Sequence, residues 1–118
     1  MRYRFIFTTW FDRDLKSLRK HNPSLRSDFE SFLETFNAEA HPIIPNTGGV
    51  RKARMRAKSK GKRGAYRVIY YLVEGDVVWL ITVYDKVQKE DLTSAEKQRI
   101  RQLVESIPRG NSKIEEQD

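Results

Sequence analysis

Residues 65–84 read AYRVIYYLVEGDVVWLITVY and form the most β-prone stretch of the chain. Aromatic and β-branched side chains dominate positions 65–73 and 76–84, and Glu74-Gly75 between them suits a tight turn. Both segments are apolar over most of their length, which is typical of central strands that are covered on two faces. The stretch therefore predicts a β-hairpin at the centre of a sheet.

The region before this hairpin predicts a strand followed by two helices. Residues 3–9 are rich in aromatic and β-branched side chains, which favour a strand. Thr9, with Asp12 three residues later, resembles a helix start, and apolar residues then recur at helical spacing. A second amphipathic pattern covers residues 24–37, after a break at Asn22. Because this connection is so short, we expect the two helices to form an antiparallel hairpin.

Two further elements complete the expected fold. Residues 50–58 alternate between basic and smaller or apolar side chains, as a strand with one buried face does. Thr93 and Glu96 form a capping-box pattern that opens a helix running to about Ser106. The order is therefore β-α-α-β-β-β-α. We predict an α+β fold with a small, mostly antiparallel sheet, an N-terminal helical hairpin and a C-terminal helix, with the helices packed on one face.

Length and composition exclude several classes of protein. The 118 residues suit one domain, which we place at residues 1–107, followed by a polar and flexible tail at residues 108–118. The absence of cysteine excludes a disulfide scaffold and a cysteine-ligated metal site, and it suits the cytoplasm. No apolar run reaches the ~18–20 residues of a membrane span, and the N-terminus does not resemble a signal peptide. The histidines, His21 and His41, are far apart in the sequence, so we expect no metal and no other cofactor.

The positive charge is concentrated in one segment. The chain has 23 basic and 16 acidic residues, a net charge of +7. Nine basic residues and no acidic ones lie between positions 51 and 67, so 14 basic residues elsewhere stand against all 16 acidic ones. Apart from Arg67, the nine are Arg51, Lys52, Arg54, Arg56, Lys58, Lys60, Lys62 and Arg63. Alternate residues of a strand are ~6.6 Å apart, so part of this set forms a row that suits successive phosphates of a polynucleotide. The alternative is a solvated charged surface.

Arg67 and Tyr84 are singled out within the hairpin. Arg67 is the one charged residue of positions 65–73, where burying a guanidinium is costly without a partner. It either grips a phosphate through two parallel hydrogen bonds or pairs with a structural carboxylate. Tyr84 ends the second strand of the hairpin, where a phenol can stack on an unpaired base or transfer a proton. The neighbouring Glu90-Asp91 pair lies where a turn or helix entry is expected, and we interpret it as structural.

These segments resemble a known family. GGVRKARMRAKSKGKRGAYRVIYY at residues 48–71, followed by WLITVYDKVQKEDLT at residues 79–93, is similar to the RelE/HigB-type toxins of bacterial type II toxin–antitoxin systems, within the RelE/ParE superfamily. The resemblance extends from residue 46 to about residue 101. The pattern K-G-K-R-G-x-x-R-x-I-Y-Y is most similar to the HigB-like branch.

The resemblance implies an activity, partners and a site. Such toxins enter the ribosomal A site and cleave the bound mRNA without a metal, which stops translation. Each is neutralised by an antitoxin encoded beside it, expected here to be a helix-turn-helix protein. By motif position, Lys52, Arg54 and Arg67 surround the scissile phosphate and Lys86 adds a further cation. The other basic residues of the segment are expected to bind the RNA.

One position departs from the RelE pattern. Leu92 occupies the place of a functional tyrosine of RelE, so the group that transfers protons is open. The candidates for that role are Tyr84, Lys58, Lys60 and Lys86.

Two other functions fit parts of the pattern. A non-catalytic RNA- or ribosome-binding module would use the basic row to follow the backbone, with steep salt dependence and no cleavage. A ParE-like toxin would share the architecture but poison DNA gyrase, so it would cause DNA breaks and leave messages intact. The dense basic row and Arg67 argue against the ParE-like toxin.

Overall fold

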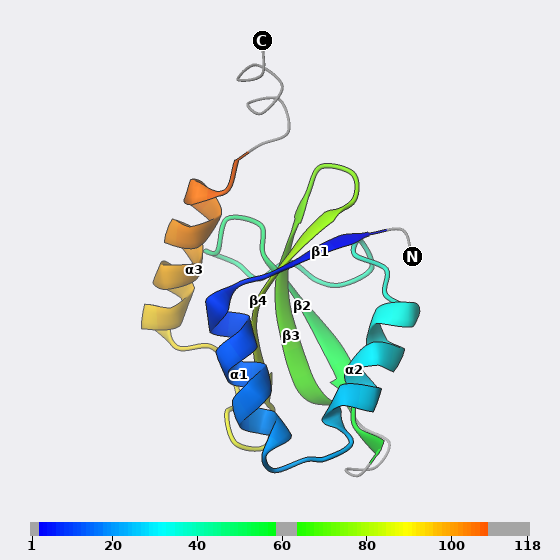
Figure 1. Cartoon of the computed structure of the whole chain (residues 1–118). Helices are drawn as coiled ribbons and strands as arrows, with labels where there is room; N and C mark the ends of the chain where they lie inside the picture. Colours follow the sequence, from blue (N-terminus) through cyan, green and yellow to red (C-terminus); the bar gives the residue numbers. More distant parts are fainter. Residues whose placement is uncertain (1–2, 59–63, 109–118) are drawn as a thin grey trace.

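The computed structural model describes residues 3–58 and 64–108, and it has the predicted order of elements. The elements are β1 (Arg4–Phe7), α1 (Thr9–Arg19), α2 (Leu25–Glu34), β2 (Arg51–Arg56), β3 (Gly64–Val73), β4 (Val77–Asp85) and α3 (Ser94–Ser106). Figure 1 shows α1 and α2 running in opposite directions beside each other, which confirms the predicted helical hairpin. Within the described ranges, none of the helices has the length and apolar character needed to cross a membrane.

The strands form one four-stranded sheet in the order β1-β4-β3-β2. β1 pairs with β4 in parallel, whereas β3 pairs with both β4 and β2 in antiparallel fashion, so the sheet is mostly antiparallel as predicted. The turn between β3 and β4 includes Gly75 at φ 83°, a left-handed conformation that favours glycine. A shift of register on β4 opposite Ile69 and Tyr70 leaves Ile81 as a bulge. The predicted central hairpin is therefore confirmed.

Helices cover both faces of the sheet, so the expectation that they all pack on one face is wrong. Phe11 of α1 and Leu25 of α2 belong to a buried cluster with Val68 of β3. Ile100 of α3 belongs to a second cluster, which contains Ile69 of β3. Because successive strand residues point to opposite faces, these two clusters lie on opposite sides of the sheet. The apolar stripe of α3 predicts that it packs on the sheet, but it carries no information about which face it covers.

The sequence predicted the N-cap of α3 correctly and that of α1 one residue too late. Thr93 and Glu96 form the capping box that the sequence predicts for α3. The N-cap of α1 is Thr8 and not Thr9, since the Thr8 hydroxyl accepts a hydrogen bond from the Phe11 N–H at 3.0 Å. The same hydroxyl lies within hydrogen-bond distance of two β4 carbonyls, at 2.9 and 3.0 Å. This long-range contact favours Thr8 as the cap and is invisible in the local sequence.

Candidate functional site

Three of the predicted site residues form a row across the sheet. Arg54 of β2 pairs in register with Arg67 of β3, and Arg67 pairs with Tyr84 of β4. Directly opposed residues of antiparallel strands project to the same face. Tyr84 packs in the cluster that contains Ile100 of α3, so the row lies on the α3 side of the sheet. Arg54 is exposed, Arg67 is half-buried and Tyr84 is 6% exposed, so the row leads from the sheet edge toward the interior.

Asp91, in the loop after β4, connects the two predicted lysines to this row. Its Oδ1 lies 3.7 Å from the Nζ of Lys52. The backbone N–H of Leu92 and the charges of lysines that include Lys52 and Lys86 hold the pKa of the Asp91 carboxyl below its usual value, although burial opposes them. Asp91 in turn contributes to raising the pKa of Tyr84. Lys52 and Lys86 thus lie near the Asp91 carboxylate, which in turn lies near the Tyr84 end of the row.

Tyr84 has a buried hydroxyl in an unusual environment. No hydrogen-bond partner reaches this hydroxyl from the part of the chain that the structure describes. Burial raises the pKa of Tyr84 to about 12, with Asp91 and Glu96 adding to the shift and Arg67 opposing it. The ammonium of Lys89 lies 5.4 Å from the centre of the ring, and Lys89 also pairs with Glu96. A buried polar atom without a partner is costly, and such atoms are expected where function requires them.

The basic residues of β2 follow the predicted alternation. Ala53, Met55 and Ala57 are buried in the α1–α2 side of the core, whereas the intervening Arg54, Arg56 and Lys58 are exposed. Arg51 projects to the same face of β2 as Ala53 and Met55. Its Nη1 donates a hydrogen bond to the carbonyl of His41 at 2.7 Å. Arg51 thus also braces the loop that precedes β2. Three further predicted RNA-binding residues, Lys60, Lys62 and Arg63, lie outside the described residues.

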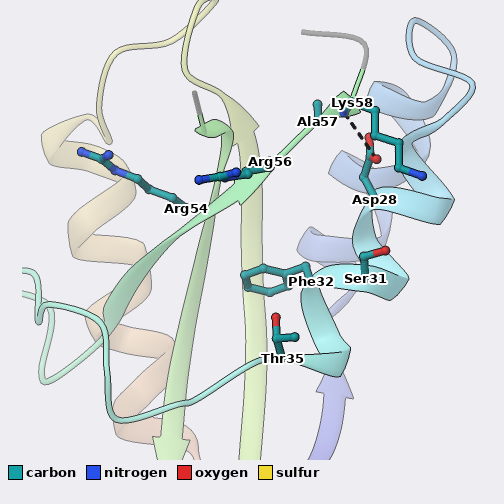
Figure 2. Close-up of a pocket in the computed structure, with 8 residues that line it drawn as sticks. All are labelled: Asp28, Ser31, Phe32, Thr35, Arg54, Arg56, Ala57 and Lys58. Carbon is teal, nitrogen blue, oxygen red and sulfur yellow. Dashed lines mark hydrogen bonds between the residues drawn. The ribbon is translucent and has the colours of Figure 1, made fainter. Parts of the chain in front are cut away.

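A pocket of about 560 Å³ lies where the end of β2 meets α2. Its lining residues are Asp28, Ser31, Phe32, Thr35, Arg54, Arg56, Ala57 and Lys58. Figure 2 shows the side chains of Arg54 and Arg56 extending to the same side of β2, away from α2. Asp28 is 4% exposed and accepts hydrogen bonds from the Ser24 hydroxyl at 3.2 Å and the Lys58 backbone N–H at 3.5 Å. This buried carboxylate ties α2 to the end of the basic strand.

The sequence did not reveal the roles of the two aspartates. Asp91 was interpreted as structural, yet its carboxylate lies beside Lys52, which is distant in sequence. Asp28 falls within the helical pattern of residues 24–37 and carried no local signal. Each contact depends on how a loop or helix folds back on β2. An aspartate next to the basic segment in the sequence would have indicated such a contact, but neither Asp28 nor Asp91 lies next to it.

The histidines lie away from this row. His41 is half-buried, with its ring stacked on Phe36 at 5.8 Å between ring centres, and burial lowers its pKa. Within residues 3–58 and 64–108, no group of three or more histidine, aspartate or glutamate side chains is arranged to hold a metal ion.

Comparison with known proteins places the chain in a family. Residues 4–114 match the family model described as the RelE toxin of the RelE/RelB toxin–antitoxin system. Among solved structures, the chain is similar to a variant of E. coli toxin RelE in the free state, in which two arginines are replaced by alanine. That pair shares 24% identity over 84% of this chain and 97% of the other, with a TM-score of 0.47. The family match includes all three strands of the Arg54–Arg67–Tyr84 row. This chain therefore belongs to the RelE toxin family and is the toxin of a toxin–antitoxin system.

Proposed function

We propose that this toxin is an mRNA endonuclease that acts on the ribosome and stops translation by cutting the message in the A site. The observation that supports this most is the row of Arg54, Arg67 and Tyr84 across three strands, with Lys52 and Lys86 beside it. Two guanidiniums directly opposite each other destabilise a sheet. A polyanionic substrate that binds between Arg54 and Arg67 would offset this repulsion.

The proposed chemistry uses the RNA's own 2′-hydroxyl. Its oxygen forms a bond to the adjacent phosphorus while the bond from phosphorus to the 5′-oxygen breaks. The products are a 2′,3′-cyclic phosphate and a 5′-hydroxyl, and no metal takes part in the proposed step. Negative charge grows on the phosphate during attack, and Arg54 and Arg67 would stabilise it from rigid strands. Alignment of the reacting atoms by the ribosome would supply a further part of the rate.

Tyr84 is proposed as the proton donor to the leaving 5′-oxygen. With its pKa at about 12, the phenol is neutral at physiological pH, which suits a donor and does not suit a base. The phenolate left behind recovers its proton from water. The group that accepts the proton of the 2′-hydroxyl is open, and Lys58, Lys60 and Lys86 are the candidates.

The toxin acts with a cognate antitoxin, as its family implies. We propose that this antitoxin is a helix-turn-helix protein with an acidic segment that covers the basic row of β2, because opposite charges favour that contact. We further propose that the toxin works in the cytoplasm on translating ribosomes and belongs to the HigB-like branch.

Expression of the toxin alone tests the activity. We expect growth arrest, with new mRNA 5′ ends inside codons of translated messages, and suppression of both by the antitoxin. Intact messages in arrested cells would contradict the proposal. DNA breaks in those cells would point to a gyrase poison instead, and ribosome binding without cuts would point to a non-catalytic module.

A further inference from the structure

A lysine outside the predicted site lies over the ring of Tyr84. Lys89 is in the loop between β4 and α3, and its ammonium is 5.4 Å from the centre of the Tyr84 ring. Its side chain is half-buried, and its charge pairs with Glu96 in the first turn of α3. Lys89 was not predicted from the sequence, because Glu90 and Asp91 follow it directly and hide its charge.

The backbone of Lys89 is tied to the residue that follows Tyr84. Its N–H donates a hydrogen bond to the Asp85 carbonyl at 2.9 Å, and the Gln88 N–H donates to the same carbonyl at 3.1 Å. The Asp85 carboxylate accepts a hydrogen bond from the Val87 N–H at 2.9 Å. The loop therefore folds into a turn at the end of β4, and this turn brings the side chain of Lys89 back to the ring.

Glu96 is itself held in place by the start of α3. One of its carboxylate oxygens accepts a hydrogen bond from the Thr93 backbone N–H at 2.8 Å, and the other pairs with the Lys89 ammonium. The Thr93 hydroxyl accepts a hydrogen bond from the Glu96 N–H at 3.1 Å. The helix start thus fixes Glu96, and Glu96 in turn limits where the Lys89 ammonium can lie.

The Lys89–Glu96 pair differs from an ordinary surface ion pair. Its side chains are 32% and 25% exposed, whereas those of the Arg26–Glu30 pair are 78% and 64% exposed. Partial burial of two charges costs solvation free energy, so such a pair is weak evidence for a role in stability. Here it places a cation near an aromatic ring, which attracts it. Because the Tyr84 hydroxyl has no hydrogen-bond partner among the described residues, contacts of the ring itself must set its orientation.

We propose that Lys89, held by Glu96, is a positioning residue that keeps the Tyr84 ring in the orientation needed for proton transfer to the leaving 5′-oxygen. This inference rests on the proposed function, and it assigns Lys89 no contact with the message. A displacement of about 1 Å of a reacting group can cost about 10²-fold in rate. Lys89 therefore contributes to the rate of cleavage, through Tyr84, and not to the affinity for the ribosome.

Three variants and one control test the contact. Lys89→Met removes the ammonium and keeps a long side chain, whereas Lys89→Arg keeps a cation that can pair with Glu96 and lie over the ring. Glu96→Gln removes the charge that holds Lys89, and glutamine can still form the capping box with Thr93. The control, Gln88→Met, introduces methionine at the neighbouring exposed position of the same loop. Circular dichroism and the thermal midpoint check that each protein is folded.

Cleavage and binding are measured separately on programmed ribosomes. At saturating toxin, Lys89→Met and Glu96→Gln should cut an ordinary message about 10- to 100-fold more slowly than the wild type, whereas Lys89→Arg and the control should cut it within a few-fold of the wild-type rate. Affinity for ribosomes that carry a message with a 2′-deoxy nucleotide at the cleavage position should be unchanged in all four. A message with sulfur in place of the leaving 5′-oxygen needs no proton donor, so Lys89→Met should cut it at nearly the wild-type rate.

A double variant tests whether Lys89 acts through Tyr84. In a protein that already carries Tyr84→Phe, Lys89→Met should slow cleavage by no more than about twofold, because the group that Lys89 positions is gone. The flip rate of the Tyr84 ring, measured by NMR on isotope-labelled tyrosine, gives a readout that needs no cleavage. We expect the ring to flip faster in Lys89→Met than in the wild type, and Lys89→Arg to restore the slower flipping.

The outcomes separate this role from the endonuclease itself. If the wild type cleaves and folded Lys89→Met cleaves equally fast, or loses as much rate in the Tyr84→Phe background, the positioning role is refuted and the endonuclease stands. A loss of affinity in place of rate also refutes the role, since Lys89 would then bind the message. Unfolding of both Lys89→Met and Glu96→Gln would refute it as well and make the pair structural. A wild type that cuts no message refutes the endonuclease, and equal flip rates in the wild type and Lys89→Met refute the contact with the ring.

Discussion

Arg67 is the residue on which the account of the site depends most. It lies on the central strand β3, between Arg54 on one neighbouring strand and Tyr84 on the other. Its Nη1 also donates to the carbonyl of Tyr66 at 3.3 Å, which limits where the guanidinium can point. A charged group held in this way on a rigid strand is suited to binding a phosphate in a fixed geometry.

Replacing Arg67 with alanine should abolish toxicity while the protein stays folded. The side chain is half-buried and lies opposite another arginine, so relief of repulsion should offset the contacts that are lost, and we expect a thermal midpoint within a few degrees of the wild type. Growth after induction and a thermal melt measure the two effects. An unfolded variant would show that Arg67 is structural, and a folded but fully toxic one would remove it from the site.

Replacing Tyr84 with phenylalanine tests the proton donor. The hydroxyl has no partner among the described residues, so its loss should not lower stability. Cleavage of an ordinary message should slow by about 10²-fold, the lower end of what a positioned acid contributes. A message with sulfur in place of the leaving 5′-oxygen should restore the rate to within a few-fold of the wild type, because a thiolate leaves without needing a proton. An equal loss on both messages would exclude Tyr84 as the donor.

At the scale of elements, the sequence predicted the strands, whose patterns depend on neighbouring residues along the chain. It missed the contacts between segments that are far apart in the sequence. The alternation around Met55 and the two-sided apolarity around Ile69 predicted β2 and β3, since each pattern is local. The face covered by α3 was predicted wrongly because a helix stripe can dock on either side of a sheet. Asp91 and Asp28 were missed because their contacts join segments far apart in sequence. The basic cluster itself was predictable because its members are close in sequence and lie on paired strands.

The start of α1 offers a sharp test at this scale. Thr8→Ala removes the side-chain cap and the contact with β4, so it should lower the free energy of unfolding by at least about 1 kcal/mol. Thr9→Ala, at the position that the sequence suggested, is the matched control and should lie within about 0.5 kcal/mol of the wild type. Urea unfolding measures both. The opposite ranking would restore Thr9 as the cap and contradict the structure.

For the whole molecule, the boundary of the domain remains a prediction. α3 ends at Ser106, and the next residue, Ile107, is 5% exposed in the cluster beneath α3. A chain that ends at Pro108 should therefore keep the thermal midpoint and the toxicity of the full chain. A chain that ends at Ser106 should be less stable by about 1.5–3 kcal/mol, because a buried isoleucine is lost. A loss of toxicity in the longer truncation would assign a role to the tail.

The positive charge of the molecule is concentrated in one segment. Nine of the 23 basic residues and none of the 16 acidic ones lie between positions 51 and 67, which include β2 and the start of β3. A surface of this kind attracts a polyanion such as RNA. The central claim is that the face with Arg54, Arg67 and Tyr84 cuts RNA only where the ribosome presents it.

The most direct test is cleavage by the purified toxin of a message on purified ribosomes with a vacant A site. We expect one cut within the A-site codon, a 2′,3′-cyclic phosphate on the upstream fragment, and no cut when the nucleotide at that position is 2′-deoxy. Free message should stay intact at the same toxin concentration. Absence of cleavage on ribosomes, equal cleavage of free message, or cleavage of the 2′-deoxy message would contradict the account.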